Sequence, residues 1–147
     1  MSNAYSQKNS EGLERLRSVI ERITDEQIDR PAGGEGWTVG GLLGHMAFYD
    51  RRALAILKKW KAQGVGTSAM DIDVANDAMK PLLDALPRRK ASELALEAAR
   101  AIDAEIESLD PELLAKVEAN GTPKLDRAGH RAHHLDQIEK AIEQETL

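Results

Sequence analysis

Histidine is the residue type in this chain best suited to chemistry, and three of the four histidines lie within five residues of one another. These three are His130, His133 and His134, and the fourth is His45. Residues four apart on a helix project from the same face, so His130 and His134 can present two imidazoles to one metal ion. His133 points away from that direction. One interpretation is therefore a metal site, and the other is a solvent-exposed helix that carries histidines by accident.

The histidines also lie at suitable places on their predicted helices. In a helical projection, His130 and His134 lie at the edge of the apolar stripe of the last helix. His45 lies at the edge of the stripe of an earlier helix, on one line with Tyr49. Side chains at such edges can reach into one groove of a bundle, so a site shared by all three is geometrically possible. A zinc protease motif is a poor match, because Arg131 stands where that motif needs glutamate.

Hydrophobic periodicity predicts the helices that must position these residues. The predicted helices cover about residues 10–25, 38–63, 72–86, 91–109 and 122–144, with a short additional helix at 111–118. Thr38 is a good N-cap, and Asp110 and Thr122 each stand before a proline as cap and first helical position. Pro81 predicts a kink or a break in the third helical region. Long helices joined by mostly short loops predict an all-α four-helix bundle, with residues 1–147 as one domain.

Three glycines, Gly40, Gly41 and Gly44, lie in the first two turns of the helix that carries His45. Each glycine costs about 1 kcal/mol relative to alanine in a helix interior. Close approach by a neighbouring helix or by a ligand would offset that cost, and packing is the favoured explanation.

Composition narrows the classes of function. Apolar residues make up 41% and charged residues 31% of the chain, and the net charge is −5. This lack of a basic excess argues against a nucleic-acid partner. No apolar run is long enough to cross a membrane and no signal peptide is recognised, so a soluble, cytoplasmic protein is expected. The chain has no cysteine, so any thiol chemistry would need an external thiol.

Two segments resemble a known family. Segment 36–46 reads GWTVGGLLGHM, a tryptophan and a capping hydroxyl followed by a helix with a histidine. Segment 130–138 reads HRAHHLDQI, a histidine pair followed by Gln-Ile. Both segments, in this helix order and at this chain length, resemble the DinB-like and YfiT-like bundles, and the resemblance covers nearly the whole chain.

The resemblance implies a divalent metal ion, usually zinc or nickel, bound by His45, His130 and His134. Three neutral histidines would leave the ion its charge and an open position for water or substrate. Some branches of the family use low-molecular-weight thiols such as bacillithiol or mycothiol, others look like hydrolases, and many have no assigned activity. The implied function is a metal-dependent hydrolase or thiol-dependent transferase that acts on a small-molecule substrate.

Three further residues have open roles. Asp50 lies inside an apolar stripe, about 140° from His45 in the helical projection, which favours a structural ion pair or helix-end contact over a role at the site. Asn76 resembles an asparagine of some relatives, but a surface or capping residue is the more ordinary interpretation. Tyr49 either lines the site or packs in the core.

Two other functions remain open at the level of sequence. The chain can be a non-catalytic protein that sequesters a small molecule or a metal, or a stress-response dimer whose histidines do not matter. Because bundles of this family often pair through helix faces, a homodimer is expected.

Overall fold

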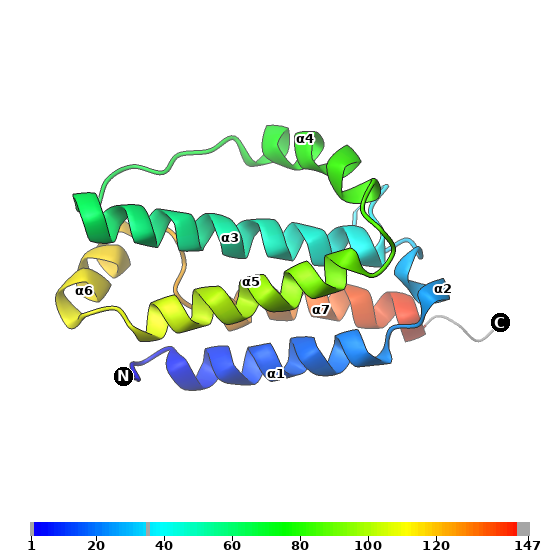
Figure 1. Cartoon of the computed structure of the whole chain (residues 1–147), viewed down its shortest axis with the longest axis horizontal. Coiled ribbons are helices and arrows are strands. Elements are labelled where there is room, and N and C mark those ends of the chain that lie inside the picture. The colour runs from blue at the N-terminus through cyan, green and yellow to red at the C-terminus, as the bar shows by residue number, and fades with distance from the viewer. Residues whose placement is uncertain (1, 35, 144–147) are drawn as a thin grey trace.

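The computed structural model describes residues 2–34 and 36–143 of the chain. Within these ranges the chain forms α1 (Ser6–Arg22), α2 (Asp25–Ile28), α3 (Val39–Gln63), α4 (Ile72–Asp84), α5 (Lys90–Glu107), α6 (Pro111–Asn120) and α7 (Arg127–Glu143) (Figure 1). The same ranges hold no strand beyond an isolated bridge between Pro31 and Thr38. The predicted all-α bundle is therefore confirmed.

Four long helices, α1, α3, α5 and α7, make the bundle. The strongest packing joins α3 to α5, and α7 contacts both α1 and α3 while α1 also contacts α5. The order around the bundle is therefore α1, α5, α3, α7, which differs from the order in the chain. Figure 1 shows that α3 and α5 run in one direction and that α1 and α7 run in the other.

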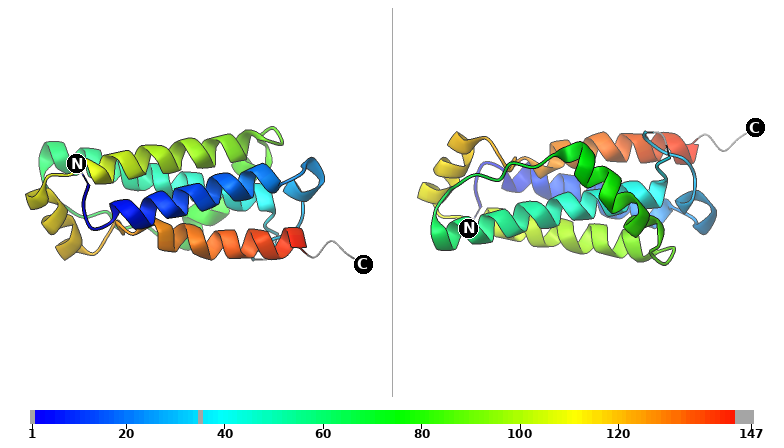
Figure 2. Two further views of the ribbon diagram at one scale, coloured as in Figure 1. Left: turned by 90° about the horizontal axis from the view of Figure 1, so that it is seen from below. Right: turned by 90° about the horizontal axis from the view of Figure 1, so that it is seen from above.

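The remaining helices lie outside this core of four. Helix α4 packs along the outer side of α3, and α6 closes one end of the bundle (Figure 2). The long crossover through α4 returns the chain to the end where α3 began, so that α5 can run parallel to α3. Within the described ranges, no helix combines the length and the apolar character that a membrane span requires.

Two apolar clusters fill the interior. One contains Leu16, Leu43, Met46 and Leu135, and the other contains Leu57 and Ile102 with buried residues of α6 and the segment after it. Each bundle helix contributes its apolar stripe, and burying these stripes is the main favourable contribution to folding. The bundle is thereby a rigid support for side chains at its grooves.

Two predicted helix starts are confirmed by their caps. The Thr38 hydroxyl accepts the backbone N–H of Gly41 at 3.0 Å and begins α3. The Asp110 carboxylate accepts the backbone N–H of Leu113 at 2.8 Å and begins α6, and Gly121 ends α6 with left-handed geometry. Both caps satisfy backbone donors that the helix leaves unpaired.

Two other predicted boundaries were wrong. The first helix was predicted to end near residue 25, but it ends at Arg22. A separate short helix, α2, follows in the region predicted as a loop, and it starts with a capping box between Thr24 and Gln27. The last helix begins at Arg127 instead of at Thr122. The Asp126 side chain accepts the backbone N–H of Gly129 at 3.0 Å and so provides the cap there. The predicted end of that helix, at residue 144, lies outside the described residues.

Helix α4 continues through Pro81 to Asp84, so the chain does not break at this proline. Packing explains two of the three glycines at the start of α3. A Cβ atom built on Gly44 would lie 2.6 Å from a Leu83 methyl group of α4, and one on Gly41 would lie 3.2 Å from the Trp37 ring. Gly44 thus allows α4 to lie close against the turn of α3 that carries His45.

Candidate metal centre

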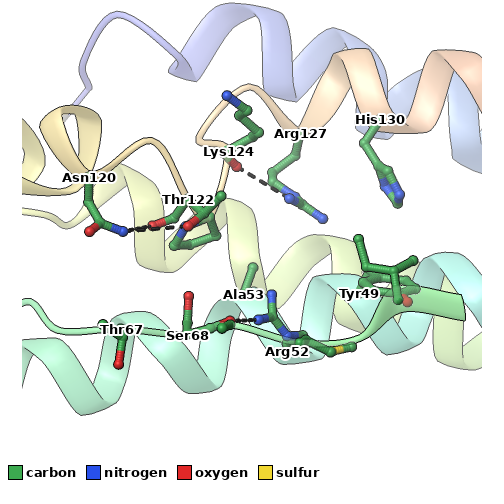
Figure 3. Close-up of a pocket in the computed structure, with 14 residues that line it drawn as sticks. Tyr49, Arg52, Ala53, Thr67, Ser68, Asn120, Thr122, Lys124, Arg127 and His130 are labelled. Atoms are coloured by element: carbon green, nitrogen blue, oxygen red, sulfur yellow. Dashed lines mark hydrogen bonds between the residues drawn. The ribbon is translucent and has the colours of Figure 1, made fainter. Parts of the chain in front are cut away.

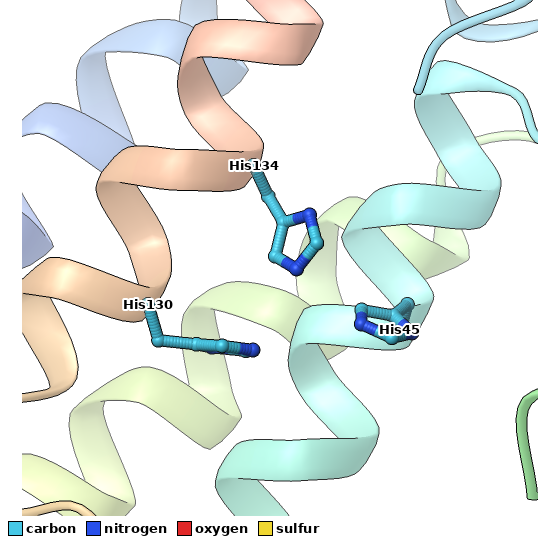
Figure 4. A group of neighbouring side chains, drawn as sticks. All are labelled: His45, His130 and His134. Carbon is cyan, nitrogen blue, oxygen red and sulfur yellow. The ribbon is translucent and has the colours of Figure 1, made fainter. Parts of the chain in front are cut away.

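The three predicted histidines come together in the groove between α3 and α7. His45 extends from α3, and His130 and His134 extend from successive turns of α7 toward it (Figure 4). All three are half-buried, whereas His133 is exposed. One ring nitrogen from each of the three lies within 4.8 Å of those of the others.

This spacing suits a small divalent ion. Zinc binds imidazole nitrogen at about 2.0–2.1 Å, which places the nitrogens of a tetrahedral site about 3.4 Å apart. Side-chain rotations that shorten the present separations, which are at most 4.8 Å, would bring the three nitrogens to one ion. The ring centres of His45 and His134 are 4.7 Å apart, and those of His130 and His134 are 5.0 Å apart.

The histidines are held in the neutral form that binds a metal. Burial lowers the pKa of His45 to about 4, with a smaller contribution from His134. Burial lowers the pKa of His130 to about 3, helped by the positive charge of Arg127. Burial also lowers the pKa of His134. Because a metal ion needs the unprotonated ring nitrogen, no proton has to be displaced at neutral pH.

The hydrogen bonding of the rings also fits a metal. Nδ1 of His134 lies 2.8 Å from Oε1 of Gln137, one turn further along α7. With the amide oxygen as acceptor, Nδ1 carries the proton and Nε2 keeps its lone pair for an ion. Nδ1 of His45 and Nδ1 of His130 are buried and have no hydrogen-bond partner among the described residues. Unpartnered buried polar atoms are uncommon and call for an explanation, which a bound ion and its ligands would supply.

Aromatic side chains enclose His45. The Trp37 ring meets it edge-on with centres 5.5 Å apart, and the Tyr49 ring lies 4.8 Å away. The Tyr49 hydroxyl donates a 2.8 Å hydrogen bond to Oδ1 of Asn76 on α4. Tyr49 therefore lines the site, and Asn76 is a half-buried partner that ties α4 to this wall instead of a surface or capping residue.

Asp50 has the structural role that was favoured. It is 1% exposed, and its Oδ1 atom accepts a hydrogen bond from Nε of Arg127 at 2.9 Å and lies 2.8 Å from Nη2 of the same guanidinium group in an ion pair. Its other oxygen lies 3.7 Å from Arg131, which pairs with Asp103 at 2.6 Å. This buried network, Asp50, Arg127, Arg131 and Asp103, links α3, α5 and α7 beside the histidines.

A pocket of about 510 Å³ adjoins the histidine cluster (Figure 3). Tyr49 and His130 lie at the end nearest the cluster, and the pocket continues between α3, the segment 64–71 and the segment that joins α6 to α7. Arg52, Lys124 and Arg127 are the charged residues in its lining. The cluster thus has an adjoining space in which a small molecule can bind.

Sequence reasoning identified the three histidines but missed the contacts around them. It noted Gln137 only as part of a motif, although this residue orients His134. It predicted an ion pair for Asp50 without naming Arg127 and Arg131, whose four-residue spacing on one helix was the available signal. Arg52 was missed because its place in the lining of the pocket depends on how the segment 64–71 folds back over α3.

A helical bundle with three histidines gathered in the groove between α3 and α7 places the chain in the class of DinB-like and YfiT-like proteins. Comparison with protein families matches residues 10–136 to the mycothiol maleylpyruvate isomerase N-terminal domain. Because this match covers most of the chain, the chain belongs to that family. No curated protein and no solved structure matches it significantly.

Proposed function

We propose that the chain is a metal-dependent enzyme that acts on a small molecule with a low-molecular-weight thiol as co-substrate. The observation that carries the proposal is the convergence of three neutral histidines from two helices at the end of a pocket. His45, His130 and His134 would hold the ion, with zinc or nickel as the expected metals. The thiol is supported by the name of the family, which refers to mycothiol.

A bound divalent ion would supply two things: a lower pKa for a thiol or water that coordinates it, and polarisation of a substrate carbonyl. Three neutral ligands suit this role because they leave the positive charge of the ion uncompensated.

The residues of the chain have supporting roles in this proposal. Gln137 fixes the tautomer and orientation of His134. Burial raises the pKa of Tyr49, so this phenol stays protonated at neutral pH and its oxygen can still accept a hydrogen bond from a ligand. Trp37 packs edge-on against His45 and limits the access of water from that side. None of the described carboxylates belongs to the metal-binding group, so the proposed chemistry depends on the ion and the thiol.

The first test is elemental analysis of the untagged full chain, beside the variants His130→Ala and His133→Ala. His133 is a matched control because it lies on the same helix and is exposed. We expect about one zinc or nickel ion per chain in the wild type and in His133→Ala, and loss of the ion in His130→Ala. Absence of metal after reconstitution, or equal metal content in all three proteins, would overturn the proposal.

A second test separates thiol chemistry from hydrolysis and from simple sequestration. Cobalt(II) is loaded in place of the native ion, and thiols are added while the near-ultraviolet spectrum is recorded. A new sulfur-to-cobalt charge-transfer band, absent in His130→Ala, supports a thiol co-substrate. Hydrolysis of activated esters without such a band would favour the hydrolase instead, and metal binding with neither property would favour a sequestering protein.

A further inference from the structure

Two of the three imidazoles in the candidate metal centre are not oriented by a hydrogen bond. Gln137 holds Nδ1 of His134. Nδ1 of His45 and Nδ1 of His130 are buried and have no such partner anywhere in the described part of the chain. A histidine that binds a metal ordinarily donates its other ring N–H to an acceptor, which fixes the orientation of the ring. A different kind of contact is therefore needed to orient His45 and His130.

The Tyr49 ring meets both of these imidazoles. Its centre is 4.8 Å from that of His45 and 6.2 Å from that of His130, within the range of roughly 4.5–7 Å at which aromatic rings attract one another. Tyr49 extends from α3, and His130 extends from α7 at the same end of the pocket (Figure 3). We propose that Tyr49 is a positioning residue for His45 and His130, and that Trp37 positions His45 from the start of α3. This inference rests on the proposed function, because it assigns the residues that would orient two of the metal ligands.

The phenol ring of Tyr49 is anchored at its far end. Its hydroxyl group donates a 2.8 Å hydrogen bond to Oδ1 of Asn76, which is half-buried on α4. Helix α4 lies close against α3 because Gly44 leaves room for the Leu83 side chain. The phenol therefore cannot rotate away from the histidines without breaking its bond to α4.

Trp37 reaches His45 because a glycine lies beneath it. The two ring planes are nearly perpendicular, at 78°, and the ring centres are 5.5 Å apart. A Cβ atom built on Gly41 would lie 3.2 Å from Cε3 and 3.8 Å from Cζ3 of Trp37. Gly41 thus lets the indole ring lie close over the first turn of α3. This contact explains a glycine at a position where alanine would favour the helix more.

The variants separate the two rings and the anchor. Tyr49→Leu removes the ring that meets both histidines, whereas Tyr49→Phe keeps the ring and removes its bond to Asn76. Trp37→Leu removes the ring that meets His45 alone, and Gly41→Ala displaces that ring with a smaller change. Trp60→Leu is the matched control for lost stability, because Trp60 lies on α3 and is 3% exposed but packs in the second apolar cluster, away from the histidines.

The first measurement uses the full chain without metal. Three-bond couplings from the backbone nitrogen and carbonyl carbon to ring Cγ, measured by NMR at pH 7.5, report the χ1 rotamer of each histidine. We expect one rotamer for His45 and His130 in the wild type and in Trp60→Leu. Tyr49→Leu should give averaged couplings for both histidines, and Trp37→Leu for His45 only. His134 should keep one rotamer in every variant, because Gln137 holds it.

The second measurement is zinc affinity by competition with a chelator, together with the visible spectrum of the cobalt(II) form. Loss of a residue that orients a metal ligand lowers metal affinity about 10–100-fold. We expect Tyr49→Leu and Trp37→Leu to bind zinc on the order of tenfold more weakly, with a changed cobalt spectrum. Tyr49→Phe should stay closer to the wild type, because its ring remains. Trp60→Leu should bind zinc like the wild type although urea denaturation shows that it is less stable.

Rotamers of His45 and His130 that stay single in both Tyr49→Leu and Trp37→Leu would overturn the inference. So would an equal loss of zinc affinity in Trp60→Leu, because lost stability alone would then account for the effect. The two proposals fail separately. Zinc uptake with rotamers that do not depend on Tyr49 overturns the positioning role alone. Rotamers that depend on Tyr49 in a protein that takes up no zinc overturn the metal-dependent function and support the positioning of the rings.

Discussion

Replacing Asp50 with asparagine should strongly destabilise the protein while leaving its shape almost unchanged. The substitution keeps the volume of a side chain that is 1% exposed and removes its charge. Arg127, itself 6% exposed, would then have no carboxylate partner among the described residues. Arg131 would keep its two hydrogen bonds to Asp103, at 2.6 and 2.9 Å. The loss therefore falls mainly on Arg127.

The magnitude follows from burial. Removing one partner of a buried ion pair costs about 3–5 kcal/mol, because the remaining charge stays in a site of low polarity without compensation. We expect about 3 kcal/mol for Asp50→Asn, since the new amide oxygen can still accept one hydrogen bond from Arg127. Against a total stability of roughly 5–15 kcal/mol, such a loss is large.

The assay is urea denaturation of the metal-free protein followed by circular dichroism. Asp136→Asn is the control, because Asp136 also pairs with an arginine, Arg15 at 2.7 Å, but is exposed. The control should lose less than about 1 kcal/mol. The double variant Asp50→Leu, Arg127→Met should recover most of the loss by removing both charges. A loss below 1 kcal/mol for Asp50→Asn, or a double variant no more stable than the single one, would refute this reasoning.

Three further predictions concern the packing and the protonation of the bundle. Gly12→Ala should destabilise the protein by about 1 kcal/mol, measured by urea denaturation, because the new Cβ would lie 2.9 Å from Cβ of Ala128. This loss should exceed the gain from the higher helix propensity of alanine. A gain in stability would show instead that α1 and α7 can move apart without cost. Folding lowers the pKa of His45 to about 4 and that of His130 to about 3, so below pH 6.5 the unfolded chain binds more protons than the folded chain. The free energy of unfolding of the metal-free protein should therefore fall on acidification from pH 6.5 to 4, by up to about 1.4 kcal/mol per pH unit for each of the two histidines. Urea curves at pH 7 and pH 5 test this, and equal stability at both would contradict the burial of the two rings. Tyr49→Phe removes the hydrogen bond to α4 and should lower stability by about 1 kcal/mol in thermal denaturation, whereas an unchanged melting temperature would mean that the bond contributes nothing.

Those parts of the fold that depend on local chemistry could be predicted from the sequence. Thr38 and Asp110 cap helices wherever the chain goes next, because each bonds to an N–H three residues further on. The start of α7 was predicted wrongly because Thr122-Pro123 carries the same kind of signal as Asp110-Pro111. In the folded chain, Pro123 and Leu125 are buried against the bundle, and the helix begins only after them. Tertiary packing there outweighs a local preference for helix.

Those parts that depend on contacts between distant segments could not be predicted. The order of the helices around the bundle depends on α4 crossing outside α3. Hydrophobic periodicity predicts which face of each helix is buried, but it does not predict which other helix packs against that face. For the histidines, the helical projection showed only that a shared site was possible, and the set of His45, His130 and His134 came from the resemblance to the family. The pocket could not be predicted, since lining residues such as Arg52 and Lys124 are 72 positions apart in the sequence and line one pocket only after the connecting segments fold.

The buried ion network and the histidine cluster depend on the same packing between α3 and α7. On α7, Arg127 and Arg131 are each followed three residues later by a histidine, His130 and His134, so the two pairs lie on adjacent faces of one helix. The arginines reach Asp50 on α3, and the histidines reach His45 on the same helix. A shift of α7 by one turn would therefore break the ion pairs to Asp50 and separate the rings from His45. The ion network and the histidine cluster therefore depend on the same register of α7 against α3, so that a change at Asp50 would also disturb the geometry of the histidines.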